Sequence, residues 1–193
     1  MTSLKLLKNL KWGVVSLNQI CEYQTNRIAY SDIIPENYIS TENMLQNCEG
    51  IIKFNGTPEV DNVIEYKKGD ILVSNIRPYL QKIWIADCDG GCNPDVLVIR
   101  VKDKTRFAPM YVDYTLRRQA FFDHMMQDKS GVKMPRGNKV NNLRFDIPNI
   151  QYSEQQQILK QVEEMETVID SAIGVASTCE DRKREVLNKY LFC

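Results

Sequence analysis

The sequence predicts an α+β protein: a globular domain with a mostly antiparallel β-sheet and a flanking helix, followed by a long C-terminal coiled-coil helix. Two observations favour this class. Short apolar segments between residues 50 and 101 are separated by turns rich in Gly, Asp and Asn, which is typical of an antiparallel sheet or partial barrel. In the last fifth of the chain, apolar residues recur at alternating steps of four and three, the period of a coiled-coil seam. We therefore expect a globular domain over 1–150 and a long helix over 151–193.

Length and charge narrow the class of protein further. The 193 residues, 43% of them hydrophobic, suffice for one core and a long helix. The 25 basic and 25 acidic residues balance, which argues against a protein that coats nucleic acid regardless of sequence but is compatible with a local basic face. Lys5, Lys8 and Lys11 interrupt the apolar start, unlike a signal peptide, and no apolar run reaches the length of a membrane span. We expect a cytoplasmic protein with no membrane association.

The first third of the chain is expected to contain short elements. Residues 12–34 have the pattern of strand or turn segments that end at Pro35. Thr41 suits the N-cap of a short helical turn. Strands are expected at 50–54 and 62–66, joined by a turn that contains Asn, Gly and Pro.

The middle of the chain predicts three further strands and one helix. The strands are expected at 71–76, 82–86 and 95–101, where apolar residues form short runs. The segment 87–92 is rich in Asp and Gly and has the composition of a loop. Pro109 suits the first turn of a single helix that continues to about Gln127, with aromatic residues on its inner face.

No cofactor, no metal site and no catalytic residue is expected. The six cysteines are scattered, and the close pair Cys88 and Cys92 lacks the second ligand pair that structural zinc sites usually have. Reduced thiols of a cytosolic protein explain them better. His124, the single histidine, has no nucleophile or orienting partner in the pattern, and the sequence contains no glycine-rich nucleotide-binding loop.

Two basic, polar stretches are candidates for contacts with nucleic acid. Residues 74–82, at the end of a predicted strand, offer an Arg, a Tyr, a Lys and amides, which suit contacts with phosphates and base edges. Residues 129–144 carry basic side chains and no acid, and their glycines and proline let backbone amides approach a phosphate. Each stretch is also compatible with a solvated hairpin end or a charged loop that keeps the protein soluble. Alternating apolar residues predict a last strand at 140–147.

The C-terminal helix is predicted to begin at Ser153, which has the spacing of a capping box with Gln156. At 1.5 Å per residue it would be roughly 55–60 Å long, longer than a domain of this size needs, so its apolar seam requires a partner beyond its own globular part. A last helix that lies on its own core is the alternative. The seam, which is the expected helix-pairing interface, consists of Ile158, Val162, Met165, Ile169, Ala172, Ala176, Cys179, Lys183, Val186 and Tyr190.

The charge pattern of the helix predicts how two copies would pair. Gly174 lies among small residues at the middle of the seam, and because glycine costs about 1 kcal/mol in an isolated helix, a packing reason is expected for it. An antiparallel pair centred on Gly174 places the basic residues 182–184 beside residues 164–166, which include two glutamates. A parallel pair would stack Lys183 against itself. The sequence therefore predicts an antiparallel homodimer.

Three segments of the chain match motifs of a known family. Residues 68–78, KGDILVSNIRP, are similar to a strand motif that begins with Lys-Gly-Asp and ends with Arg-Pro. Residues 146–150 and 154–158 are similar to the Ile-Pro and Glu-Gln motifs that lead into a spacer helix, and Trp12 begins a segment similar to the start of a target recognition domain. Through these segments the chain resembles, from about Trp12 to the C-terminus, the specificity (HsdS) subunits of Type I restriction-modification systems.

The resemblance implies a DNA-recognition protein that is not an enzyme. In this family a target recognition domain reads one half of a bipartite site in double-stranded DNA. The long helices pair antiparallel, set the distance between two such domains and dock the methyltransferase subunits, which the restriction subunits join. A complete subunit has two domains and two helices, whereas this chain has one of each. It therefore resembles a half-length form, in which two copies pair to read a palindromic split site, or a fragment or recombination cassette.

The resemblance does not transfer individual DNA contacts, because the recognition loops differ between such domains. Charged side chains of the two basic stretches would contact phosphates, and their amides and tyrosine would read bases. Two alternatives stay open: a recognition domain detached from a single-chain restriction enzyme or methyltransferase, and a coiled-coil scaffold that binds protein and has no DNA role. The candidate DNA-binding residues are Asn75, Arg77, Tyr79, Lys82, Lys133, Arg136, Asn138 and Lys139.

Overall fold

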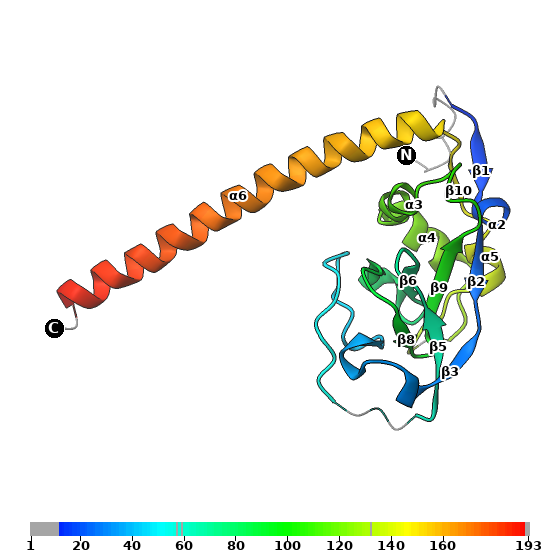
Figure 1. The fold of residues 1–193 in the computed structure, drawn as a ribbon, viewed down its shortest axis with the longest axis horizontal. Helices are drawn as coiled ribbons and strands as arrows, with labels where there is room; N and C mark the ends of the chain where they lie inside the picture. The colour runs from blue at the N-terminus through cyan, green and yellow to red at the C-terminus, as the bar shows by residue number, and fades with distance from the viewer. Residues whose placement is uncertain (1–11, 57, 59, 132, 192–193) are drawn as a thin grey trace. The chain divides into compact units, whose positions relative to one another are not determined.

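The chain folds into a mixed α+β unit and a long helix (Figure 1). The computed structural model describes residues 12–56, 58, 60–131 and 133–191. It divides the chain into two compact units, Met1–Tyr152 and Ser153–Cys193. The predicted α+β class is confirmed, with mostly antiparallel sheets and a long C-terminal helix.

The described part of the globular unit contains three β-sheets. The two-stranded sheet pairs β1 (Val14–Ser16) with β10 (Asp146–Pro148). The second sheet has the order β2 (Cys21–Gln24), β9 (Val96–Val101), β6 (Ile71–Ser74) and β7 (Ile83–Ile85). The third has the order β3 (Arg27–Ala29), β5 (Asn62–Tyr66), β8 (Gly90–Cys92) and β4 (Tyr38–Ile39). Neighbouring strands are antiparallel except β4 and β8, which are parallel.

Short helices fill the connections between the strands. Among the described residues, the α-helices of the globular unit are α2 (Leu17–Ile20), α3 (Pro109–Leu116), α4 (Gln119–Gln127) and α5 (Lys139–Asn142). The 3₁₀ turns are η1 (Tyr30–Asp32), η2 (Pro35–Asn37) and η3 (Pro78–Leu80). The long helix is α6 (Tyr152–Leu191).

The central strands β6 and β9 carry the core of the globular unit. Every residue of β6 is buried, and in β9 only Arg100 is partly exposed, as expected for strands covered on both faces. Arg100 turns to the fully buried Asp70, where its Nη2 lies 2.6 Å from Oδ2. Leu72 packs with Tyr66 and Trp84, whose rings meet edge to face at 5.9 Å. This packing joins the two four-stranded sheets.

The prediction of a single helix over 109–127 is wrong, because two helices, α3 and α4, form there. Arg118 has an extended backbone, with φ −71° and ψ 140°. Arg117 turns inward, where its Nε donates to the buried Asp113 at 2.7 Å and its Nη1 to the carbonyl oxygen of Cys48 at 3.2 Å. These contacts hold the end of α3 and redirect the chain into α4, which buries Phe121 in the core.

The loop predicted over 87–92 is limited to residues 87–89, because Gly90–Cys92 form strand β8. A Cβ on Gly90 would lie 2.5 Å from the Tyr66 hydroxyl oxygen, and one on Gly91 would lie 2.3 Å from Cγ2 of Val63. The glycines therefore permit close packing of β8 between β5 and β4, whereas in the sequence they had indicated a turn.

No strand forms at 50–54, where Ile51 makes an isolated bridge to Met44. The segment is held instead by Asn43, whose carbonyl accepts from the N–H of Ile52 and whose Nδ2 donates back to the Ile52 carbonyl oxygen. The helical turn predicted after Thr41 is a simple turn in which Ser40 Oγ accepts the Glu42 N–H at 3.2 Å. Side-chain hydrogen bonds thus replace the two predicted elements.

Two boundaries near the C-terminal end of the globular unit differ from the prediction. The strand expected at 140–147 is limited to β10, because Asn138 caps the short helix α5 before it. Its Oδ1 accepts from the N–H groups of Val140 and Asn141 at 3.0 and 3.2 Å. Helix α6 begins at Tyr152, so Ser153 lies within its first turn rather than at its N-cap.

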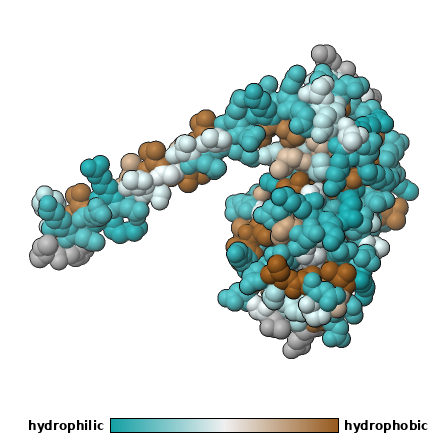
Figure 2. Space-filling view, viewed as in Figure 1, coloured by the Kyte–Doolittle hydropathy of each residue, from teal (hydrophilic) through white to brown (hydrophobic). Residues whose placement is uncertain are grey.

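Helix α6 spans 40 residues, about 60 Å at 1.5 Å per residue. Figure 2 shows apolar side chains at intervals along it, between polar ones. Ion pairs at i,i+3 spacing join Lys183 to Glu180 and Arg184 to Asp181 on its surface. Within the described part of the chain, none of the helices combines the length and apolar content needed to cross a membrane.

Candidate nucleic-acid interface

The two basic stretches, far apart in the sequence, lie side by side in the fold. The N–H of Arg77 donates to the carbonyl oxygen of Pro135 at 2.8 Å, and the N–H of Gly137 donates to that of Asn75 at 3.1 Å. Ile76 and Arg136 form an isolated antiparallel bridge between them. The end of β6 and the second basic stretch, residues 129–144, which we call the basic loop, therefore form one continuous surface. We call it the basic surface.

The strand end presents its side chains through an unusual backbone. Arg77 and Gln81 both adopt left-handed conformations, with φ of 50° and 52°, on either side of η3. Pro78 is buried between them and anchors the turn, while Arg77 and Tyr79 are exposed. Non-glycine residues are uncommon in this conformation. With Arg77 and Gln81 both left-handed, the turn between them directs the Arg77 guanidinium and the Tyr79 phenol towards solvent.

Lys82 connects the strand end to the turn that precedes β5 in the chain. Its Nζ donates to the carbonyl oxygen of Thr41 at 2.6 Å. Partial burial, and in smaller measure the positive charge of Arg77, lower the pKa of the Lys82 ammonium. Lys82 therefore holds the Thr41 turn in place as well as adding positive charge to the surface.

Asn75 lies beneath the basic surface rather than on it. Its side chain is 4% exposed, and its Oδ1 accepts from Asn142 Nδ2 at 3.4 Å. A Cβ at Gly137 would approach that Oδ1 to 3.0 Å, so the glycine lets the basic loop pack directly on Asn75. This placement suits Asn75 to position the loop, and its amide does not face solvent, where a base edge would be.

The basic loop itself contains two side chains that already have partners. Arg136 forms a two-pronged ion pair with Asp95, with Nε–Oδ1 and Nη2–Oδ2 distances of 3.2 Å, and both side chains are partly exposed. Asn138 caps α5 and donates from Nδ2 to Asp128 at 2.7 Å. Lys133 and Lys139 are exposed. Lys129 and Arg144, at the two ends of this loop, are exposed as well, so its exposed positive charges are these four side chains and the outer face of Arg136.

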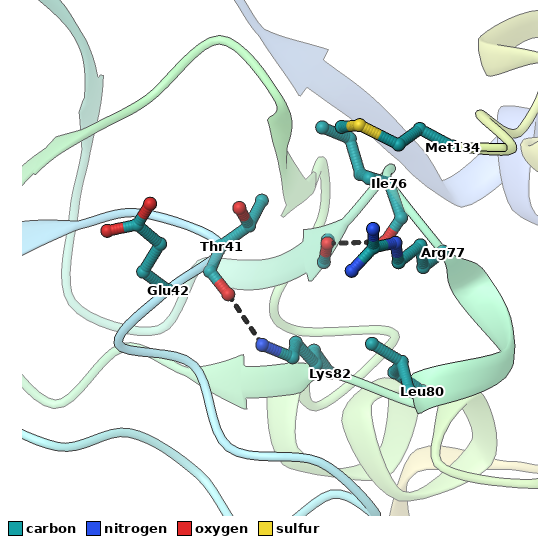
Figure 3. Close-up of a pocket in the computed structure, with 8 residues that line it drawn as sticks. Thr41, Glu42, Ile76, Arg77, Leu80, Lys82 and Met134 are labelled. Carbon is teal, nitrogen blue, oxygen red and sulfur yellow. Dashed lines mark hydrogen bonds between the residues drawn. The ribbon is translucent and has the colours of Figure 1, made fainter.

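A surface pocket of about 260 Å³ lies at the edge of the basic surface (Figure 3). Figure 3 shows Thr41 and Glu42 on one side of the pocket and Arg77 and Leu80 on the other, with Met134 above. No motif or period in the sequence links the turn that contains Glu42 to the distant basic stretches, so Glu42 could not be recognised from the sequence. The lining residues are Thr41, Glu42, Ser74, Ile76, Arg77, Leu80, Lys82 and Met134.

The groups that could hold a metal or take part in catalysis have structural contacts. His124 Nε2 lies 2.7 Å from the carbonyl oxygen of Asn141, and its ring packs against Phe145 at 5.5 Å. Burial raises the pKa of the Cys21 thiol and of the Cys92 thiol to about 12. Among the described residues, no three or more His, Cys, Asp or Glu side chains are grouped as a metal site.

The predicted seam of α6 leaves most of its side chains exposed. Of the seam residues, Val162 is partly buried, and the others are exposed. The exposed fraction reaches 64% for Met165, 56% for Ile169 and 71% for Tyr190. A Cβ added at Gly174 would meet no heavy atom within 4 Å among the described residues. The middle of the helix therefore has room for a close neighbour.

The chain is similar to Type I specificity subunits both in sequence and in fold. No protein-family model matches the chain. The Type I restriction enzyme EcoDI specificity subunit of Escherichia coli is 30% identical over 107 residues, which are 55% of this chain and 23% of that protein. The motif-based resemblance to specificity subunits is thus confirmed in sequence over about half of the chain.

Solved structures extend the likeness to nearly the whole chain. The HsdS subunit from Thermoanaerobacter tengcongensis superposes with a TM-score of 0.65 at 18% identity, covering 94% of this chain and 48% of that subunit. The Type I S subunit from M. genitalium gives a TM-score of 0.57 at 15% identity, covering 94% of this chain and 45% of that subunit. The globular unit and helix therefore have the HsdS fold, and the chain spans about half the length of these subunits.

Proposed function

We propose that this chain, an HsdS-like protein with one globular domain, acts as half of a Type I specificity subunit. Its globular unit reads one half of a bipartite site in double-stranded DNA, and it catalyses no reaction itself. The observation that carries the proposal is the basic surface, in which the Arg77–Pro135 and Gly137–Asn75 hydrogen bonds merge two basic stretches. The likeness to specificity subunits supports the same role.

The side chains of the basic surface would have three different functions: contacting phosphates, contacting bases and shaping the surface. Lys133, Lys139 and Arg77 are exposed and would contact phosphates, which fixes the register of the protein on DNA. Tyr79, 51% exposed, would reach base edges. Asn75, Asn138 and Lys82, the other candidates, already position the loop, cap α5 and hold the Thr41 turn, so they would act mainly by shaping the surface.

Pairing of two copies would complete the subunit. An antiparallel homodimer through α6 would bury the exposed seam and relate two globular units by a two-fold axis, as a palindromic split site requires. The exposed apolar residues of α6 and the open space at Gly174 support this arrangement. The paired helices would dock methyltransferase subunits, which restriction subunits join, in the cytoplasm.

A binding titration with the full chain tests the DNA role. Fluorescence anisotropy would follow double-stranded DNA at several salt concentrations, with the chain alone and with its cognate methyltransferase subunit. We expect salt-dependent binding, which Arg136→Ala weakens for all sequences while lowering the slope of log K against log salt by about 1. Asp95→Asn releases Arg136 from its ion pair and should strengthen binding by up to about fivefold.

A matched control separates the basic surface from total charge. Lys104 is exposed and follows the end of β9 opposite to Asp95, so Lys104→Ala should leave the affinity unchanged. No binding with or without the methyltransferase subunit would contradict the proposal and favour a protein-binding scaffold. Equal effects of Arg136→Ala and Lys104→Ala on DNA affinity would show that the basic loop does not contact DNA.

A further inference from the structure

The pocket beside the basic surface presents one carboxylate, Glu42, from a rigid turn. The Thr41 carbonyl oxygen on one side of it accepts from Lys82 Nζ at 2.6 Å, and the Glu42 N–H donates to Ser40 Oγ at 3.2 Å. Asn43 on the other side donates to the carbonyl oxygens of Tyr38 and Ile52, both at 3.1 Å. The backbone of Glu42 is therefore fixed before any ligand binds.

The Glu42 carboxylate differs from the other acids near the basic surface. Asp95 pairs with Arg136, and Asp128 accepts a hydrogen bond from Asn138 Nδ2 at 2.7 Å. Throughout the described ranges, no Lys or Arg side chain forms an ion pair with Glu42, which is exposed. Figure 3 shows its carboxylate pointing away from the Lys82 ammonium, although both line the same pocket. The acid is thus available to an incoming partner.

A carboxylate on a DNA-facing surface needs a specific partner. Phosphate groups repel it, so it adds affinity only where it accepts a hydrogen bond from a base. In the major groove, Glu and Asp side chains accept from the N4 amino group of cytosine. Arg77 and Lys82, across the pocket from Glu42, would meanwhile offset its charge near the phosphates.

We infer that Glu42 is a specificity-determining residue, which reads a cytosine in the major groove by accepting a hydrogen bond from its N4 amino group. The inference rests on the proposed DNA-reading function and goes beyond it, since it assigns one base type to one side chain. Glu42 would discriminate between sequences, whereas the lysines and arginines of the basic surface would bind all of them.

Selection from a randomised double-stranded DNA library tests this assignment. The full chain with its methyltransferase subunit would be compared with Glu42→Ala, Glu42→Gln and the control Glu36→Gln, an exposed acid that lines a different pocket. We expect the unaltered chain to enrich a motif with a cytosine at one position. Glu42→Ala should lose that preference, by on the order of tenfold in relative affinity, and Glu42→Gln should shift the position towards adenine, whose N6 and N7 suit a glutamine amide.

Different outcomes would contradict the assignment of Glu42 and the proposed DNA-reading function on which it rests. If Glu42→Ala enriches the same motif with the same preference at every position, or binds all sequences more tightly by one factor, Glu42 is only a local charge. If the unaltered chain binds DNA but enriches no motif, the inference and sequence reading both fail, while the binding titration still reports the basic surface. Melting temperatures of the variants show whether each is folded.

Discussion

Most apolar side chains are buried in the globular unit, whereas those along the long helix are mostly exposed. In the unit, Ile71 and Leu72 of β6 are 0% exposed, and both four-stranded sheets contribute buried residues to the apolar cluster around Leu72. In α6, Ile169 and Val168 are 56% and 69% exposed. The unit thus completes its own core, whereas the helix presents an apolar seam that another surface would cover. The globular unit therefore buries most of its apolar residues within itself, whereas the proposed pairing would depend on the exposed apolar residues of the helix.

A matched pair of isoleucines tests this contrast with the largest expected effect. Ile71→Ala removes a fully buried side chain and should lower the free energy of unfolding by about 2–5 kcal/mol, because a cavity remains. Ile169→Ala at low protein concentration should change it by less than about 0.5 kcal/mol. Chemical denaturation followed by circular dichroism measures both. Similar losses in the two variants would mean that α6 already buries its seam within one chain.

Alkaline pH should destabilise the unit through its buried thiols. Burial raises the pKa of Cys21 and of Cys92 to about 12 from the ordinary 9.0, so the folded chain keeps protons that the unfolded chain releases. Their contribution to stability is complete below pH 9 and is lost as the pH rises from 9 towards 12, by about 1.4 kcal/mol per pH unit and thiol. Denaturation between pH 8 and 10.5 measures the slope.

Cys21→Ala is the control for this pH dependence. The variant should lose stability less steeply above pH 9, by one thiol's share of the slope. An unchanged slope would show that Cys21 is accessible to solvent in the folded chain.

The exposed Cys179 should report on pairing of the helix. It belongs to the predicted seam and is exposed, so a maleimide should modify it rapidly in dilute solution, while the buried Cys21 and Cys92 react slowly. An antiparallel pair would cover Cys179 and slow its modification as protein concentration rises. Mass spectrometry of the labelled peptides gives each rate. A Cys179 rate that does not depend on concentration would contradict a pair along this seam.

Local patterns predicted the elements that depend on local physics. The four-three period predicted the helix that became α6, and short apolar runs predicted β5, β6, β7 and β9 to within a residue or two. The pattern failed at Gly90 and Gly91, because glycine serves a turn and a tightly packed strand equally well. It failed at Arg118, because the inward turn of Arg117 depends on Cys48, distant in the chain.

The site was less predictable than the fold, because it depends on contacts between residues that are far apart in the sequence. The two basic stretches were selected from composition, but their union depends on hydrogen bonds such as Arg77 to Pro135, which no local pattern encodes. The burial of Asn75 follows from the loop that packs on it, and Glu42 reaches the pocket through the Lys82–Thr41 contact. Side chains that matter through long-range contacts could be found only in the folded chain.

Footprinting on DNA enriched from the library tests the central claim most directly, that one globular unit reads a half-site and that two copies joined by α6 read a split site. Hydroxyl-radical cleavage of DNA bound by the full chain and its methyltransferase subunit would map the protected positions. We predict two protected segments with inverted sequences, separated by a spacer of constant length, because a two-fold axis relates the two units. A single protected segment, or two segments in direct repeat, would contradict the account.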